Sequence, residues 1–318
     1  MIAAPRPPDP TMRERDPLSA LSLVLGSTDA LRNTRALFVL LGTFAAAGLL
    51  VSMAENTLLR EPGWWGSVQA GAALFVAFYG GNAAGILVMD DARGREVRDI
   101  PLALRASLAS AHRLLFALAI VFGACAIAAG ALLGLLWLSR VAVTGAVVGP
   151  LLFGLVVPVG VLAVGLVALS LIAVVVPLAA PGVWAGLGVW PIVTRLAALV
   201  RQRLLTVALL MAAVSLLTAG VGAIATFVVA VGGRVVAQLA IVVVGVEVPP
   251  QQLMSGLFGI GLRSLGATGV PLGPGGHAAA ALVGGGVVFA LALVLPGLVY
   301  LRGTCAVYLA MTGEARAR

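Results

Sequence analysis

Charged side chains are concentrated in one run of the sequence, residues 90–99. The run mixes carboxylates with guanidinium groups, a set suited to ion pairing and to docking a charged partner in the cytosol, although a solvated, flexible loop is an equally open interpretation. No serine or cysteine has a candidate general base, so nucleophilic catalysis is not expected. The candidate partner-docking residues, from this run and from a later basic segment, are Asp90, Asp91, Arg93, Arg95, Arg98, Arg195 and Arg201.

Metal and haem ligands are scarce in the sequence. The two histidines, His112 and His277, fall outside the centres of the apolar runs, whereas the two cysteines, Cys125 and Cys305, fall within them. No cluster of these residues has the spacing of a metal or haem site. We therefore predict no catalytic residue, no cofactor and no metal site, and we expect that the protein is not an enzyme.

The composition is that of a polytopic membrane protein. Of the 318 residues, 61% are hydrophobic and 10% are charged, against about 45–50% and about 25% in soluble domains. The net charge of +8 comes entirely from arginine, because the chain has no lysine. These arginines stand at the ends of apolar runs, where they would anchor to lipid headgroups. Membrane lipids are therefore expected partners, and nucleic acid is not.

Six apolar runs are long enough to cross a bilayer as helices. A helix rises about 1.5 Å per residue, so about 20 residues cover a hydrocarbon core of about 30 Å. In the fourth run we expect a kink near Pro158. The predicted spans are residues 36–54, 67–89, 114–138, 151–178, 204–231 and 278–301, the last of which could continue to residue 312.

Three short amphipathic segments, residues 17–35, 101–113 and 181–203, each end in arginine and lead into a span. Their amphipathic pattern predicts helices that lie at the membrane surface. The predicted fold is therefore an all-α, polytopic transmembrane helix bundle. Its six spans form three pairs, and a cytosolic interfacial amphipathic helix precedes each pair.

The remaining segments complete the predicted organisation. A disordered cytosolic tail covers residues 1–16, a six-span membrane domain covers 17–312 and a second tail covers 313–318. Within the domain, residues 232–276 form an excursion on the non-cytoplasmic side. Its apolar part, 235–248, is too short for a span, and a re-entrant segment and a surface helix both remain open.

The orientation follows from the distribution of arginine. Fifteen arginines fall on the side of the two termini and four fall on the other. Because cytoplasmic loops carry the excess of basic residues, both termini are expected in the cytoplasm. We predict a multi-pass protein of the bacterial cytoplasmic (inner) membrane.

Two glycine-rich steps within the spans have alternative interpretations. The run Tyr79-Gly80-Gly81-Asn82 could be an unwound point, or it could be a close contact between helices. The same two interpretations apply to the run Gly284-Gly285-Gly286. All 12 carboxylates lie outside the predicted span centres. A carrier that moves protons or cations usually places a carboxylate there, so such a carrier is not expected.

The interfacial segments open on similar runs, DPLSAL at 16–21, DIPLAL at 99–104 and APGVWAGL at 180–187, and the sequence VYLRG occupies 299–303. With them, residues 16–312 resemble the six-span bacterial membrane domain that precedes a glycerophosphodiester phosphodiesterase in some proteins, and related stand-alone membrane proteins of unassigned role. The resemblance carries over no catalytic activity, because no phosphodiesterase domain follows the last span. The chain also resembles the six-span permeases of export-type ABC transporters in its interfacial helix before span one, its loop between spans two and three and its excursion before span six.

Three functions are consistent with these features. The leading hypothesis is a non-enzymatic scaffold or accessory subunit of a larger membrane assembly, with other membrane subunits or a cytosolic protein as partners. Its basis is the small-residue surface, which includes 40 glycines. The alternative is a permease subunit of an ABC-type transporter, driven by a separate ATPase docked on residues 90–113 and 181–203. In a third hypothesis, the interfacial helices bind anionic lipid.

Overall fold

The computed structural model describes residues 25–60, 63–140, 145–244 and 277–313. All regular structure in these ranges is helical, and six helices are long and apolar enough to cross a membrane, which confirms the predicted all-α, six-span fold. In chain order the elements are the 3-10 helix η2 (Gly26–Arg32), α2 (Thr34–Arg60), α3 (Trp64–Ala92), α4 (Ile100–Ser110), α5 (His112–Arg140), α6 (Gly145–Ser170), the π-helical turn η4 (Leu171–Val175), α7 (Val176–Trp184), α8 (Val189–Val244) and α11 (His277–Thr312).

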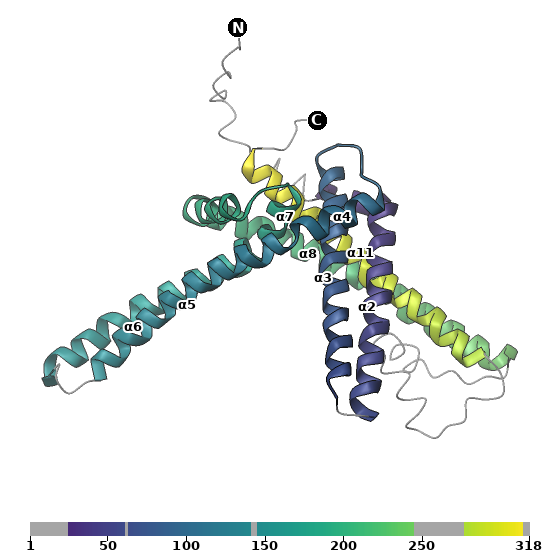
Figure 1. Ribbon diagram of the computed structural model, residues 1–318, viewed down its shortest axis with the longest axis horizontal. Helices are drawn as coiled ribbons and strands as arrows, with labels where there is room; N and C mark the ends of the chain where they lie inside the picture. Colours follow the sequence, from purple (N-terminus) through teal and green to yellow (C-terminus); the bar gives the residue numbers. More distant parts are fainter. Residues whose placement is uncertain (1–24, 61–62, 141–144, 245–276, 314–318) are drawn as a thin grey trace, which may run out of the picture.

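The long helices form three hairpins that diverge from a shared end (Figure 1). α2 packs along α3, α5 along α6, and α8 along α11. We call these hairpins the legs. At the shared end lie η2, α4, α7, the first part of α8 up to Arg203, and the adjacent ends of α3 and α11, and we call this region the hub.

Two close contacts between paired helices lie at glycines. At Gly80 of α3 a Cβ atom would overlap the side chain of Thr43 in α2. At Gly303 of α11 a Cβ atom would lie 2.6 Å from Cγ1 of Val214 in α8. α3 stays helical throughout the Tyr79 to Asn82 step, so the interpretation as a packing contact is confirmed and the unwound point is wrong.

The buried core lies in the hub. Residues 82–90 of α3 are buried at every position, so protein surrounds this part of the helix on all sides. α2, α4, α7 and α11 all contact α3. The largest fully buried side chains of the cluster include Leu87, Met89, Leu178, Ile192 and Leu298. They come from α3, α7, α8 and α11, and Ala117 of α5 belongs to the same cluster, so apolar packing joins all three legs at this end.

The fourth span departs from its predicted shape. α6 runs through Pro158 without a break, and the irregular turn is η4, directly before α7. There the N–H of Val176 bonds to the carbonyl of Leu171, a π-type step. Pro177, next in the chain, has no N–H to give to a carbonyl in this turn, which accounts for the local widening. The irregularity in the backbone of this span thus lies at η4, whereas α6 is continuous through Pro158.

The fifth span also differs from the prediction. Residues 181–203 are not one interfacial helix, because the chain turns at residues 185–188 between α7 and α8. α8 bends at Arg203, where φ is −140° and ψ is 23°, and then continues to Val244, well beyond the predicted end at residue 231. The predictions for residues 1–24, which include the first eight residues of the first interfacial segment, for the rest of the excursion from 245 to 276 and for 314–318 lie outside the described residues.

Candidate functional site: a polar hub around the end of α3

A buried amide joins α3 to α7. Trp184 Nε1 donates a hydrogen bond of 2.9 Å to Oδ1 of Asn82, and both residues are buried. The Nδ2 group of Asn82 donates to the carbonyl of Phe78 at 2.8 Å, so the amide is satisfied on both sides. Gly85 makes room for the indole, because a Cβ atom there would overlap the ring of Trp184. α7 is thus held to α3 by shape and by a directed polar contact.

About two turns beyond Asn82 along α3, a carboxylate is buried with its partner. Asp90 is 2% exposed. Arg98 Nη2 donates to its Oδ1 at 3.1 Å, and Arg98 Nε lies 2.9 Å from its Oδ2. A buried carboxylate is tolerated when it has a charged, hydrogen-bonding partner of this kind. The interpretation of the whole run as a solvated, flexible loop is therefore wrong at Asp90.

The loop after α3 begins with a left-handed glycine. Gly94 has φ of 65°, and its N–H bonds to the carbonyl of Asp91 at 2.9 Å. The N–H of Arg95 bonds to the carbonyl of Asp90 at 3.0 Å. This pair of bonds is the Schellman arrangement, which satisfies the last carbonyls of a helix and turns the chain sharply. The turn sends residues 95–99 back over the end of α3, where Arg98 reaches Asp90.

α7 ends in the same way. Gly186 has φ of 89° and its N–H bonds to the carbonyl of Val183 at 2.8 Å, while Leu187 bonds to Gly182 at 3.2 Å. The two helix ends are linked, because Arg93 Nη1 donates to the carbonyl of Ala185 at 3.4 Å. Arg93, directly after the end of α3, thus binds a free carbonyl at the C-terminal end of α7, where a positive charge is favourable.

Two further arginines connect the third leg to the hub. Arg302 of α11 forms an ion pair with Asp91 of α3, and its side chain is 14% exposed. Arg195 of α8 donates a hydrogen bond of 3.3 Å to the hydroxyl of Tyr308 in α11. Arg302 lies in an apolar run, so a carboxylate partner offsets the cost of placing its charge there.

The first leg and α4 are tied to the same loop and helix. Arg35 of α2 donates to the carbonyls of Val97, at 2.5 Å, and of Arg98, at 3.2 Å, and it lies 3.3 Å from the carboxylate of Asp99. Ser107 of α4 donates to the carbonyl of Tyr79 in α3 at 2.7 Å. The first and third legs, together with α4 and α7, therefore meet polar groups of α3 or of the loop that follows it.

The structure separates the seven candidate docking residues. Asp90 and Asp91 are paired within the hub, and Arg93, Arg98 and Arg195 take part in its contacts. The other two, Arg95 and Arg201, are exposed.

Sequence reasoning missed the partners that complete the network: Arg35, Asn82, Trp184, Arg302 and Tyr308. The available signal was the presence of an amide, an indole and a guanidinium inside otherwise apolar runs.

The arrangement is suited to fixing helices, because its polar groups bind one another. Within the described ranges, no group of three or more His, Cys, Asp and Glu side chains could hold a metal ion. Comparison with known proteins finds no matching family model, no matching curated protein and no matching solved structure. The resemblances to a six-span membrane domain and to ABC permeases stay predictions.

Proposed function

We propose that the chain is a non-enzymatic integral membrane protein that serves as a scaffold or accessory subunit of a larger membrane assembly. In this proposal the hub and both termini lie at the cytoplasmic face of a bacterial inner membrane, and the legs cross it. The observation that supports an assembly role is the outer face of α5. This helix belongs to the span with the fewest buried residues, 11% of its most apolar stretch.

α5 has two faces of different character. One packs on α6, where a Cβ atom at Gly160 would lie 3.0 Å from Leu132 of α5. The opposite face carries Gly123, Ile127, Gly130 and Gly134, which follow the spacing of one side of a helix. Ile127 is 76% exposed, and a Cβ atom built at any of these three glycines would meet nothing within 4 Å.

This outer face fits another transmembrane helix better than it fits lipid. Glycine inside a helix lowers helix stability by about 1 kcal/mol relative to alanine, and contact with lipid chains does not offset this loss. Packing against a neighbouring helix does offset it, because glycines four residues apart, such as Gly130 and Gly134, let two backbones approach closely. We therefore assign this face to a partner subunit.

The test is purification of the full chain in mild detergent, with and without the double substitution Gly130→Ile and Gly134→Ile. We expect the wild type to bring down a membrane partner in a fixed ratio and the double variant to lose it, because two side chains would separate the helices. Gly165→Ile is the control, since Gly165 is also exposed with open space around it but lies on α6. A wild-type chain that runs alone as a monomer, or a double variant that keeps its partner, would contradict the proposal.

The alternative is a permease subunit driven by a separate ATPase. The structure leaves Arg95 and Glu96 exposed in the loop between α3 and α4, where a cytosolic protein could dock. Loss of a co-purifying ATPase on Arg95→Glu, with no effect of the glycine substitutions, would favour this alternative over a scaffold that binds through α5.

A further inference from the structure

Two groups of arginines in and beside the hub differ in their partners. Those of the first group are paired with carboxylates, Arg98 with Asp90, Arg302 with Asp91 and Arg35 with Asp99. The second group consists of Arg105, Arg113, Arg201 and Arg203, and none of these four is paired with a described carboxylate. The chain has no Asp or Glu from residue 100 to residue 246, so positive charge is unbalanced over this part of the hub.

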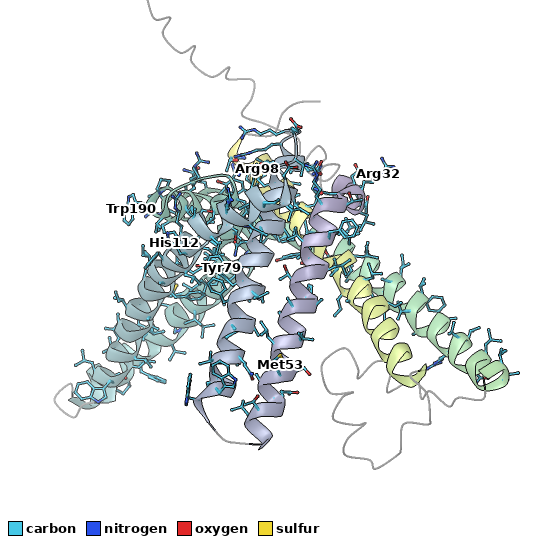
Figure 2. The ribbon with its side chains drawn as sticks, turned by 45° about the vertical axis from the view of Figure 1, so that its right-hand side comes forward. Arg32, Met53, Tyr79, Arg98, His112 and Trp190 are labelled. Carbon is cyan, nitrogen blue, oxygen red and sulfur yellow. The ribbon has the colours of Figure 1, made fainter. Side chains whose placement is uncertain are left out.

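The second group lies where two legs leave the hub. Arg105 is on α4, Arg113 is in the first turn of α5, and Arg203 marks the bend of α8. α5 packs against α8, and Ala117 of α5 and Leu199 of α8 belong to the same buried cluster. Figure 2 shows His112, at the start of α5, and Trp190, at the start of α8, on the same side of the hub. We call the four arginines of this region the arginine surface.

Exposed apolar side chains flank the arginine surface. α4 buries Ala103 and Ser107, and it exposes Leu104 and Leu108, which are 40% and 51% exposed. Trp190 is 67% exposed. Leucine beside arginine on one short helix, with an exposed tryptophan at the start of α8, is the composition of a surface at the boundary between acyl chains and headgroups.

We propose that the arginine surface binds anionic phospholipid from the leaflet at the hub. The guanidinium groups hold the phosphates by charge-assisted hydrogen bonds, while Leu104, Leu108 and Trp190 contact the upper part of the acyl chains. Lipid fits this surface better than an acidic protein does, because the arginines stand where α5 and α8 enter their apolar runs, at the height of the headgroups. The paired arginines of the first group hold the hub together instead.

The test uses the full-length protein in mild detergent, titrated with phosphatidylglycerol or with phosphatidylcholine of the same acyl chains, with bound lipid counted by native mass spectrometry. We expect the wild type to prefer phosphatidylglycerol. An arginine near a membrane surface contributes about fivefold in affinity for anionic lipid, so the triple substitution of Arg105, Arg201 and Arg203 by Gln should weaken binding about 100-fold. The substitution Arg95→Gln removes the same charge from a loop position beside Glu96, and it should change binding less than about twofold.

A second triple variant, with Lys in place of each of the three arginines, keeps the charge and should keep the preference for phosphatidylglycerol. It keeps the test decisive if the Gln variant fails to fold. Equal binding of the two lipids by the wild type would overturn the proposal, and so would a folded Gln variant that binds phosphatidylglycerol as the wild type does. Unchanged lipid binding together with loss of a co-purified acidic protein would overturn it in favour of a protein partner.

Discussion

α3 and α5 are helices of the same length, 29 residues, and both are predominantly apolar. Their surroundings are nevertheless opposite. In the span of α3, 56% of the most apolar stretch is buried, and α3 ends in the centre of the hub. In the span that contains α5 the corresponding share is 11%, and most of the helix extends into a leg. Overall apolarity therefore does not distinguish a helix surrounded by protein from one that faces outward.

Polar and small residues make the distinction. The buried half of α3 carries an amide at Asn82, a carboxylate at Asp90 and a close-packed glycine at Gly85, each matched by a group on another element. α5 has open space at its glycines and no carboxylate. In lipid, apolar surface alone gives no drive for helices to associate, so directed contacts and close packing decide where they meet. The hub is built from such contacts.

The largest expected difference between hub and legs comes from leucine truncation. Leu87→Ala removes a fully buried side chain of the hub and should lower the free energy of unfolding by about 2–5 kcal/mol. Leu216→Ala, the matched change at a position on α8 that is 77% exposed, should cost less than about 0.5 kcal/mol. Denaturant titration of the purified protein in mild detergent measures both. Equal effects at the two positions would remove the distinction between hub and legs.

Loss of the hydrogen bond between Asn82 and Trp184 should lower the free energy of unfolding by a smaller amount. Trp184→Phe keeps an aromatic ring but leaves the Asn82 oxygen buried without its donor, so it should cost about 1–3 kcal/mol. The measurement is the same titration, run as a double-mutant cycle with Asn82→Ala, in which the second substitution should add less than it does alone. Additive effects would show that the hydrogen bond does not couple α3 to α7.

The ion pair between α3 and α11 is half-buried, so a more modest effect is expected. Asp91→Asn removes the charge that faces Arg302 and should cost about 1–2 kcal/mol, at the low end for contacts of charged groups because Asp91 is 36% exposed. The thermal midpoint in detergent should fall, and the further substitution Arg302→Met should restore part of the loss. A variant as stable as the wild type would mean that this pair does not join the third leg to the hub.

The smallest effect is expected at the edge of the hub. Arg35 and Asp99 form an exposed pair, with side chains 48% and 71% accessible, so solvent weakens their attraction. Arg35→Gln should therefore lower the unfolding free energy by less than about 1 kcal/mol, most of it from the hydrogen bonds to the carbonyls of Val97 and Arg98. A loss as large as that of Leu87→Ala would place the centre of the hub at this loop instead.

The spans could be predicted from the sequence because their signal is local. An apolar run of sufficient length is enough, and the six runs correspond to six helices. The pattern predicted a helix over residues 101–113, and α4 occupies residues 100–110. Glycine is also a local signal for the end of a helix, and Gly94 and Gly186 follow the ends of α3 and α7.

The hub could not be predicted, because its contacts join residues that are far apart in the chain. Asn82 and Trp184 are 102 positions apart, and Asp91 and Arg302 are 211 apart. No local sequence pattern predicts which of these distant residues will pair. The charges of residues 90–99 looked alike in sequence, whereas the fold buries Asp90 and exposes Arg95. The bend of α8 at Arg203 could not be predicted, because no proline or glycine lies beside it in the sequence.

In the proposed topology three legs cross the membrane from a hub on its cytoplasmic side, and this can be tested by the accessibility of single cysteines. With Cys125 and Cys305 replaced by Ala, a single cysteine is placed at Gly63, at the tip of the first leg, or at Glu96, in the hub loop, and both positions are exposed. In spheroplasts, a membrane-impermeant thiol reagent should label Gly63→Cys at once and Glu96→Cys only after the membrane is disrupted. Labelling of both positions in intact spheroplasts, or of Glu96→Cys alone, would overturn this topology.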